Sequence, residues 1–294
     1  GNTVDGKSNN VQLAGGNLIQ LTDALGEDAE IYVTPDGTPP VNVAVKDNYT
    51  IIDDDAARFH ADDTSSGYEF AVINNGYYIE MRIKPHTHKI CADSTCTDDS
   101  HGDVEFNAWS DNSKLPDRAG NWYLTTDVTL DTTWEPASGT VLDLNGHSIT
   151  MEIEGAVIDV TGSFTLTDCK GGVDTNPYGQ ITHKTGIKGS GVNMNKANAS
   201  FTMYGGNIYG NTSIGNGGGI WAGSQTVITM YGGTISGNTA SSSGSSFGNG
   251  GGVFVNGTFT MNGGNIYGNT APKNGGGVCI NSGGAFNMTK GMIG

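Results

Sequence analysis

Histidines and cysteines gather in one short stretch of the sequence. His86, His88, Cys91, Cys96 and His101 fall within sixteen residues, in the spacing H-x-H-x2-C-x4-C-x4-H. Two histidines at i and i+2 project from the same face of a strand, and the cysteines are close enough to share one ion. Because Zn²⁺ takes four such nitrogen and sulfur ligands, this stretch predicts a structural zinc site with one ligand to spare. A Cys91–Cys96 disulfide is the main alternative, and neither bond nor ion is the third.

Three consecutive carboxylates form a second candidate site. Asp53, Asp54 and Asp55 begin a stretch that reads as a short helix ending at Phe59. They could bind Ca²⁺, but they lack the D-x-D-x-D-G spacing of a calcium loop. Carboxylates at the positive end of a helix also stabilise it without any ion. We therefore expect helix capping, with calcium as the weaker alternative.

The composition separates two parts of the chain. The 294 residues include 47 glycines and carry a net charge of −16. Residues 1–174 contain all 30 Asp and Glu against nine Lys and Arg, a net −21, whereas residues 175–294 contain five lysines and no acid. The acidic balance argues against a nucleic-acid binder, which needs basic residues to neutralise phosphates. No run of eighteen apolar residues exists, so we expect no membrane span in this segment.

A repeat occupies the carboxylate-free part. The stretch Phe201–Thr212 returns almost unchanged as Ile228–Thr239 and Phe259–Thr270, and a degenerate copy begins at Phe286. The methionines of the four copies are spaced 27, 31 and 27 residues apart, at Met203, Met230, Met261 and Met288. A glycine triplet and a short apolar strand follow each full copy, at Ile220–Ala222, Val253–Val255 and Val278–Ile280. A period of this length indicates a solenoid.

Each period contains three short strands with alternating side chains, joined by Gly and Asn turns. This is the pattern of one coil of a parallel β-helix, in which coils stack about 4.8 Å apart and equivalent side chains form ladders. We expect an amide ladder of Asn211, Asn238 and Asn269, corner glycines with positive φ and right-handed winding. In the third strand, the alternation places Trp221, Phe254 and Cys279 outward.

Weaker alternation extends upstream of the repeat. The predicted fold class is all-β, a right-handed parallel β-helix with a small β-rich capping domain. The predicted divisions are 1–13, which completes a coil of a preceding β-helix, 14–84, the capping domain, 85–119, the Cys/His junction, and 120–294, the β-helix. The capping domain is expected to hold strands at Leu18–Leu21, Glu30–Thr34, Val41–Val45, Glu69–Ile73 and Tyr77–Ile83.

The two ends of the sequence match each other within the repeat. Alignment of the methionines places Gly294 directly before the position of a Gly-Asn-Thr, and the sequence starts with Gly-Asn-Thr. Val11–Leu13 follows Gly1 at the spacing at which Val278–Ile280 follows Gly268. We therefore expect one unit of a tandem array, in which Gly294 joins Gly1 of the next unit. The alternative is a segment between two β-helices that are not identical.

The repeated M-x-G-G-x-I-x-G-N-T…G-G-G-[VI] units, over residues 85–294 and 1–13, resemble the pectin-lyase-like right-handed β-helix repeats of large bacterial surface proteins, including adhesins and autotransporter passenger-like proteins. They are also similar to the repeats of polymorphic outer-membrane proteins. The stretch from His86 to His147 looks like the junction before such solenoids in Gram-positive gut bacteria. The resemblance implies the fold and an extracellular or cell-surface location.

Some proteins of this fold cleave polysaccharides, which the residue inventory argues against. Lyases need Ca²⁺ held by carboxylates and an Arg or Lys base, and glycosidases need two carboxylates roughly 5–10 Å apart. No carboxylate follows Asp174 and no arginine follows Arg118, which excludes an active site on the regular coils. Asp143, Asp159 and Asp168 could line one face of the early coils, but outward acids are common on an acidic surface protein. We expect no enzyme.

A structural role is the leading expectation for function. Units joined end to end would build an extracellular fibre, stalk or filament, with copies of the chain as its partners. The alternative is an adhesin-type module whose aromatic side chains stack on a glycan or a host protein. Its candidate binding residues are Trp221, Phe254, Tyr204, Tyr209, Tyr231 and Tyr267.

Overall fold

The chain forms two compact units, Gly1–Pro85 and His86–Gly294. The computed structural model describes residues 3–4, 7–8, 11–13, 16–22, 25–35, 41–46, 50–61, 70–90, 102–170, 178–242 and 248–294. Each unit has a hydrophobic core of its own, and both are built from short strands. The prediction of an all-β protein is therefore confirmed.

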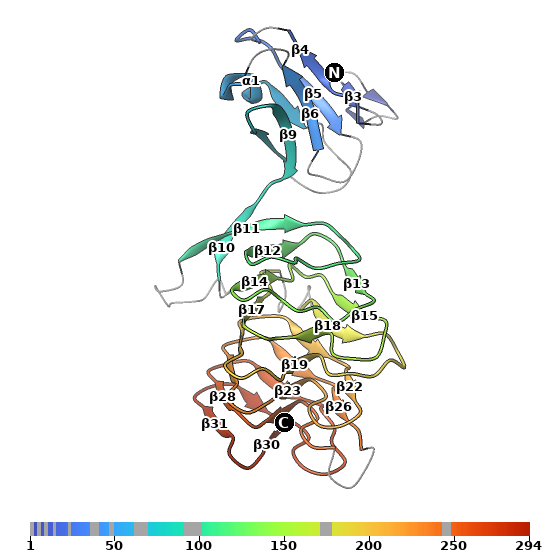
Figure 1. The fold of residues 1–294 in the computed structure, drawn as a ribbon, viewed down its shortest axis with the longest axis vertical. Coiled ribbons are helices and arrows are strands. Elements are labelled where there is room, and N and C mark those ends of the chain that lie inside the picture. The colour runs from blue at the N-terminus through green and yellow to red at the C-terminus, as the bar shows by residue number, and fades with distance from the viewer. Residues whose placement is uncertain are drawn as a thin grey trace. The chain divides into compact units, whose positions relative to one another are not determined.

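The C-terminal unit is a parallel β-helix whose coils contribute strands in turn to three sheets (Figure 1). The first sheet contains, in spatial order, β10 (His86–Lys89), β11 (Asp103–Trp109), β12 (Asn121–Leu124), β14 (Thr140–Asp143), β17 (Ser163–Thr167), β20 (Ser200–Met203), β24 (Val227–Met230), β28 (Thr258–Met261) and β31 (Ala285–Met288). The second contains β13 (Val128–Leu130), β15 (Ile149–Met151), β18 (Gln180–His183), β21 (Asn207–Tyr209), β25 (Thr234–Ser236), β29 (Asn265–Tyr267) and β32 (Met292–Ile293). The third contains β16 (Ile158–Asp159), β19 (Val192–Met194), β23 (Ile220–Ala222), β27 (Val253–Val255) and β30 (Val278–Ile280). A shorter pair, β22 (Thr212–Ser213) and β26 (Thr239–Ala240), lies at a corner.

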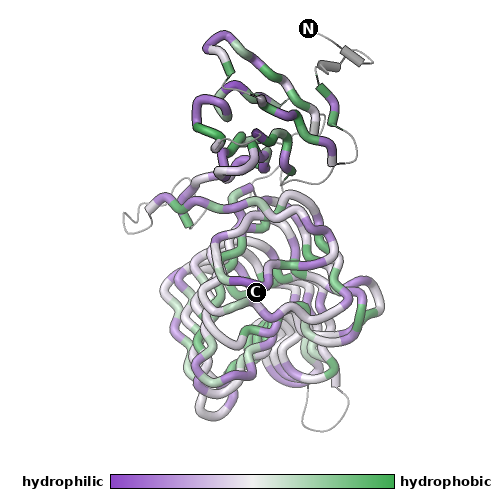
Figure 2. Tube along the Cα trace, turned by 45° about the horizontal axis from the view of Figure 1, so that its top comes forward, coloured by the Kyte–Doolittle hydropathy of each residue, from purple (hydrophilic) through white to green (hydrophobic). Residues whose placement is uncertain are grey.

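Pairing in these sheets is parallel from β11 onward, whereas β10 pairs with β11 in the antiparallel sense. The coils stack in register, so that Phe201, Ile228, Phe259 and Phe286 follow one another along the first sheet, as do the repeat methionines. Hydrophobic and hydrophilic segments alternate along the coils (Figure 2). The inward residues of the three sheets form one continuous core, which includes Phe164, Phe201 and Phe259. The alternation in the repeat therefore predicts the inward faces of these coils correctly.

Corner glycines hold the coils together closely. Gly206, Gly233, Gly264 and Gly291 occupy equivalent corners and have φ between +78° and +105°. A Cβ atom on Gly233 would lie 2.6 Å from the carbonyl oxygen of Gly206 in the coil before. Both the backbone angle and the close approach exclude a side chain here. The high glycine content of the repeat thus reflects tight corners.

The predicted amide ladder is present at another corner. Nδ2 of Asn211 donates to Oδ1 of Asn238, and Nδ2 of Asn238 donates to Oδ1 of Asn269; the donor–acceptor distance is 3.0 Å in both bonds. The backbone N–H groups of Asn211 and Asn238 donate to the same two oxygens. His183 precedes the ladder, with its Nδ1 2.7 Å from Oδ1 of Asn211. Because Asn211 and Asn238 are fully buried, these bonds satisfy polar groups that would otherwise be costly to bury.

The N-terminal unit begins with parallel strands and ends with antiparallel ones. One parallel sheet contains β3 (Val11–Leu13), β5 (Ile31–Pro35) and β7 (Phe59–Ala61). In the other sheet, β4 (Ile19–Leu21) pairs in parallel with β6 (Val41–Lys46), and the antiparallel strands β9 (Tyr78–Ile83) and β8 (Phe70–Asn74) follow. β1 (Thr3–Val4) pairs with β2 (Lys7–Ser8), and α1 spans Asp53–Ala57. These elements agree with the five strands expected between residues 18 and 83, and α1 lies where the helix is expected. The helix is shorter than expected, because it ends at Ala57 and Phe59 begins β7, a strand that is not among those predicted. The predicted roles of 1–13 and 14–84 stay predictions.

Asp55 anchors α1 inside the N-terminal unit. Its carboxylate is 1% exposed and lies 2.8 Å from Nζ of Lys46. The backbone N–H groups of Leu25 and Ile52 donate to it as well. Burial alone would raise the pKa of Asp55, but the hydrogen bonds and the charge of Lys46 outweigh burial and lower it. Asp55 is thus a structural ion-pair partner in this structure, while the calcium alternative for these carboxylates stays untested.

Candidate metal centre

Four side chains that can bind a metal meet where the β-helix begins. His86 and His88 lie on β10, one residue apart on the same face. Asp143 is the last residue of β14, and Cys169 comes two residues after the end of β17. Because β14 and β17 are paired neighbours, with Asp143 opposite Thr167, the turns after them stack on each other. The antiparallel hairpin β10–β11 thereby brings its histidines to two successive coils.

The geometry of this cluster is compact. Nε2 of His86 and Nε2 of His88 each lie 3.0 Å from the same oxygen, Oδ2 of Asp143. One ligand atom from each of the four residues lies within 4.8 Å of all the others. Asp143 is fully buried, and the other three side chains are half-buried. Such a group of nitrogen, oxygen and sulfur donors could hold a metal ion.

Aromatic rings orient both imidazoles. The ring of His86 stacks on Tyr123 with centroids 3.8 Å apart, and the ring of His88 stacks on Phe106 at 4.3 Å. Nδ1 of His88 lies 2.7 Å from the carbonyl oxygen of Lys89, which can only accept a hydrogen bond. Nδ1 therefore carries the proton, so that in the neutral ring the lone pair is on Nε2 and faces Asp143. A backbone carbonyl is one of the partners to which a metal-binding histidine commonly donates its other ring N–H.

The other carboxylate oxygen of Asp143 is fixed by the backbone. The N–H groups of Asn145 and Cys169 both donate to Oδ1, and the donor–acceptor distance is 2.9 Å in both bonds. Asn145 adopts a φ of +50° in the turn that follows β14, a region that asparagine tolerates better than most residues. Oδ1 thus positions the carboxylate, which leaves Oδ2 to face the two histidines.

Electrostatics in the cluster favour a cation or protons between the donors. Burial alone would raise the pKa of Asp143, but hydrogen bonds from His86, His88 and Cys169 outweigh burial and hold it well below its usual value. Burial lowers the pKa of His88, and the hydrogen bond to Asp143 more than reverses this. Burial, and then the negative charge of Asp143, raise the pKa of the Cys169 thiol. The raised pKa favours the protonated thiol, and hydrogen bonds from its neighbours stabilise the carboxylate.

A second buried carboxylate lies beside the cluster. Asp168 accepts hydrogen bonds from the backbone N–H groups of Gly146 and Gly179, at 2.8 and 2.7 Å. Burial, together with the charge of Asp143, raises the pKa of Asp168 despite these bonds. Its two oxygens link the turn after β14 to the start of β18. Asp168 therefore acts as a structural connection between coils.

The structure brings together only part of the predicted ligand set. His86 and His88 meet in the cluster, while Cys91, Cys96 and His101 lie outside the described residues, so their roles stay predictions. Sequence reasoning missed Asp143 and Cys169 as candidate ligands. Their separation of 26 residues, close to one coil, was the signal that could have placed them on neighbouring coils.

The predicted aromatic binding residues fall into three environments. Tyr209, Tyr231 and Tyr267 are each 44% exposed. The ring of Tyr204 stacks on that of Tyr231 with centroids 4.8 Å apart. The side chain of Phe254 is buried, although Val253 and Val255 on either side of it are the residues that belong to the core, and Trp221 in the coil before is half-buried. The exposed aromatic surface therefore lies at the tyrosines and not along the third sheet.

Comparisons of the chain with protein-family models, with curated proteins and with solved structures find no match. Among the described residues, no helix has the length and apolar character needed to cross a membrane. The site therefore has to be interpreted from its own geometry.

Proposed function

We propose that this chain is a structural unit of an extracellular fibre, stalk or filament, whose units join end to end and which catalyses no reaction. The observation that carries the proposal is the continuity of the three parallel ladders, whose strands stack coil after coil through β30, β31 and β32. Apolar side chains on these strands are 38–53% exposed, namely Ile280, Met288, Met292 and Ile293.

A parallel edge with exposed apolar side chains is a template for another strand. The regular coils also carry no carboxylate, which supports a structural rather than a catalytic role. Their neutral ladders give stiffness, because each coil makes the same bonds to the next. End-to-end growth would extend this arrangement from one unit to another.

The experiment is to measure assembly of the full chain over a range of concentrations, by sedimentation velocity and electron microscopy. We expect linear oligomers that lengthen with concentration. Met288→Lys should abolish them, because it places a charge on the exposed edge, whereas Asn287→Lys, with its side chain on the outward face of the same strand, should weaken them less. Equal behaviour of the two variants, or compact oligomers, would contradict the proposal.

The tyrosine surface favours a second candidate, a binding module for glycans or host proteins. Stacked, half-exposed tyrosines offer flat faces to sugars. Tyr231→Ala, with Tyr77→Ala in the other unit as an exposed control, separates the two functions in a glycan-binding assay. Loss of binding in the first variant alone would support the binding module.

Zn²⁺ is the ion that we propose for the cluster of His86, His88, Asp143 and Cys169. Two imidazoles, a carboxylate and a thiolate are a donor set that Zn²⁺ accepts, whereas Ca²⁺ requires oxygen ligands. Tetrahedral zinc holds its ligand atoms about 3.4–3.6 Å apart, so donors within 4.8 Å of one another need to move by roughly 1 Å or less. Four protein ligands would close the site, which is typical of a structural ion that fastens the β10–β11 hairpin to the coils.

Cobalt substitution tests the ion and its ligands. We expect one Co²⁺ per chain, with visible absorption typical of tetrahedral coordination and a thiolate charge-transfer band. Cys169→Ser should remove the charge-transfer band and Cys279→Ser should leave it unchanged. If the band instead disappears in a Cys91→Ser, Cys96→Ser variant and persists in Cys169→Ser, the ligand set predicted from the sequence holds and the present assignment fails.

A further inference from the structure

The first strands of the N-terminal unit have the same spacing as the last strands of the C-terminal unit. Val11–Leu13 forms β3 and Ile19–Leu21 forms β4. Val278–Ile280 forms β30, and Ala285–Met288 forms β31. The differences 278 − 11 and 286 − 19 both equal 267, so one offset superimposes both strands and the turn between them.

The turn itself supports this correspondence. Gly16 lies between β3 and β4 with a φ of +76°, and Gly283, at the same offset, lies between β30 and β31 with a φ of +92°. Both turns therefore place a glycine where other residues are strained. The apolar residues also share a phase, because Val11, Leu13 and Ile19 pack on the core of their unit as Val278 and Phe286 pack on theirs.

The two sets of strands are open on opposite sides. β3 and β4 are the first strands of their sheets and pair with the strands one coil later, β5 and β6. β30 and β31 are the last strands of theirs and pair with the strands one coil earlier, β27 and β28. An open edge that faces the preceding coil is thus matched by an open edge that faces the following coil.

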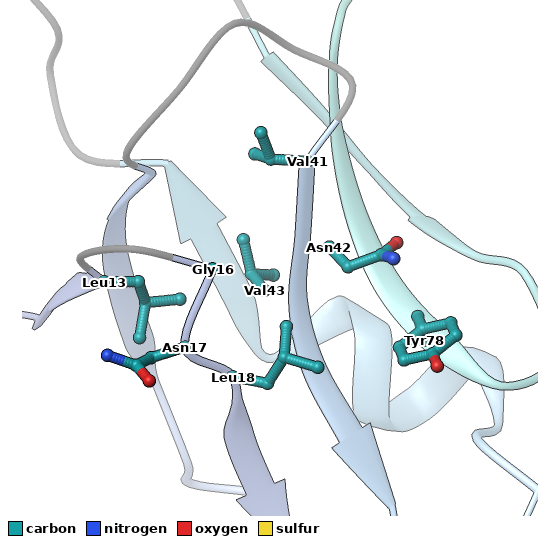
Figure 3. A pocket seen from close by; sticks show the side chains of 8 residues that line it. All are labelled: Leu13, Gly16, Asn17, Leu18, Val41, Asn42, Val43 and Tyr78. Atoms are coloured by element: carbon teal, nitrogen blue, oxygen red, sulfur yellow. The ribbon is translucent and has the colours of Figure 1, made fainter.

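A cavity of the N-terminal unit lies between the β3–β4 turn and the strands that follow it. It has a volume of about 290 Å³ and is lined by the β3–β4 turn, the start of β6 and Tyr78 (Figure 3). Leu13, Leu18, Val41 and Val43 supply its apolar lining. Asn17, Asn42 and Tyr78 add polar atoms to this lining.

We infer that β3 and β4 are the docking strands for β30 and β31 of a second copy, in the register Val11 to Val278, Gln12 to Cys279 and Ile19 to Phe286. This inference rests on the proposed function and names the surface and register through which units join. On this reading the N-terminal unit is the end of a β-helix of the same kind. Its parallel coils receive the neighbour, and the antiparallel strands β9 and β8 stop further growth.

The hydrogen bonds and charges are consistent with this docking. In Asn211 and Asn238, the backbone N–H donates to the amide oxygen of the next coil. Asn269 is the last described rung, and the offset of 267 places Asn2 as the next one, although Asn2 lies outside the described residues. The lysine-bearing, acid-free part of one copy would also meet the acidic part of another, and opposite charges speed such association.

Cysteine cross-linking tests the register. Paired residues in a parallel ladder lie about 4.8 Å apart, within the range that a disulfide spans, and Gln12 is exposed on its strand. Gln12→Cys in the full chain should form an intermolecular disulfide to Cys279, identified by mass spectrometry of the linked peptides. Cys279→Ser should abolish it. Gln20→Cys should link to Asn287→Cys and not to Cys279.

A second measurement keeps the test decisive if separate copies associate weakly. It uses the same cysteine pairs in a fusion of two full chains, in which Gly294 of the first is joined to Gly1 of the second. There, the link should form within one molecule, between position 12 of the second copy and Cys279 of the first. Linear assembly with cross-links at other positions would overturn the register and leave the proposed function standing. No specific link in the fusion, together with no assembly of the single chain, would overturn both.

Discussion

The first coils of the C-terminal unit and its later coils are held together by different chemistry. At the start, a hairpin and two coils meet at two histidines, an aspartate and a cysteine. In the later coils, the same neutral groups recur in register, coil after coil. Identical rungs allow the stack to be extended, because each coil presents the same hydrogen-bonding groups and side chains to the next coil. A beginning has no preceding coil, so it requires groups that occur once.

The largest expected loss of stability is at the start of the β-helix. Asp143→Ala removes the oxygen shared by His86 and His88 and leaves two buried backbone N–H groups without their acceptor. Loss of one partner from a buried charged cluster costs roughly 3–5 kcal/mol. Because coils contact only their neighbours, hydrogen exchange should show lost protection in residues 102–170 and little change in residues 200–267.

Asp159→Ala is the matched control. Asp159 is a half-buried carboxylate on β16, in the same coil as Asp143, and accepts one hydrogen bond from Asn193. We expect a loss of about 1 kcal/mol or less. Similar losses for the two variants would mean that the cluster does not anchor the first coils.

The next largest loss of stability is expected in the amide ladder of the later coils. Asn238→Ala removes the amide that accepts from Asn211 and donates to Asn269, leaving several buried groups unsatisfied at a cost of about 2–3 kcal/mol. Asn269→Ala should cost less, because this last rung is only half-buried. Denaturant unfolding and hydrogen exchange of both variants check the order. An equal loss at the two rungs would show that the ladder adds nothing beyond each local bond.

The amide ladder and the cluster also differ in how far the sequence predicts them. The ladder is visible because Asn211, Asn238 and Asn269 recur at the coil period, and equal spacing fixes which side chains meet. The cluster joins residues from a hairpin and from two irregular coils, so no single period connects them. His86 and His88 were found by their local spacing, whereas Asp143 and Cys169 required the register of β14 and β17.

The alternation in the third sheet shows another limit. It places Ile220 and Val253 inward correctly, and it places Phe254 outward, yet Phe254 is 5% exposed. Alternation reports which side of a strand a residue occupies and not whether neighbouring coils cover that side. The N-terminal unit shows a limit of composition. Its acidic composition separates it from the repeat, whereas its first two strands keep the repeat's spacing.

The smallest expected effect extends the comparison to pH. The pKa of Asp55 is lowered in the folded protein, so its contribution to stability is present above the ordinary Asp value of 3.8 and is lost as the pH falls through the folded value. The loss should be on the order of 1 kcal/mol, the difference between charged and neutral hydrogen bonds. The later coils contain no carboxylate and should show no matching change.

Hydrogen exchange of both regions between pH 5 and about 2 is the measurement. Asp55→Asn should flatten the acid dependence of residues 41–61 and leave residues 200–267 as they were. An acid dependence that survives this substitution would assign the effect to other carboxylates of the N-terminal unit.

The side-chain-to-side-chain hydrogen bonds that begin at His183 run one way along the stack, from His183 to Asn211, then to Asn238 and Asn269. The Nδ2 groups of Asn211 and Asn238 also donate back to backbone carbonyls of the preceding coil. The two faces of a coil in this ladder are therefore chemically different, because one presents amide donors and the other presents amide oxygens. Two such stacks cannot meet by the same face and close into a symmetric dimer through this ladder. Units that joined through this ladder, as proposed, would add head to tail, and contacts of that kind have no built-in limit on length.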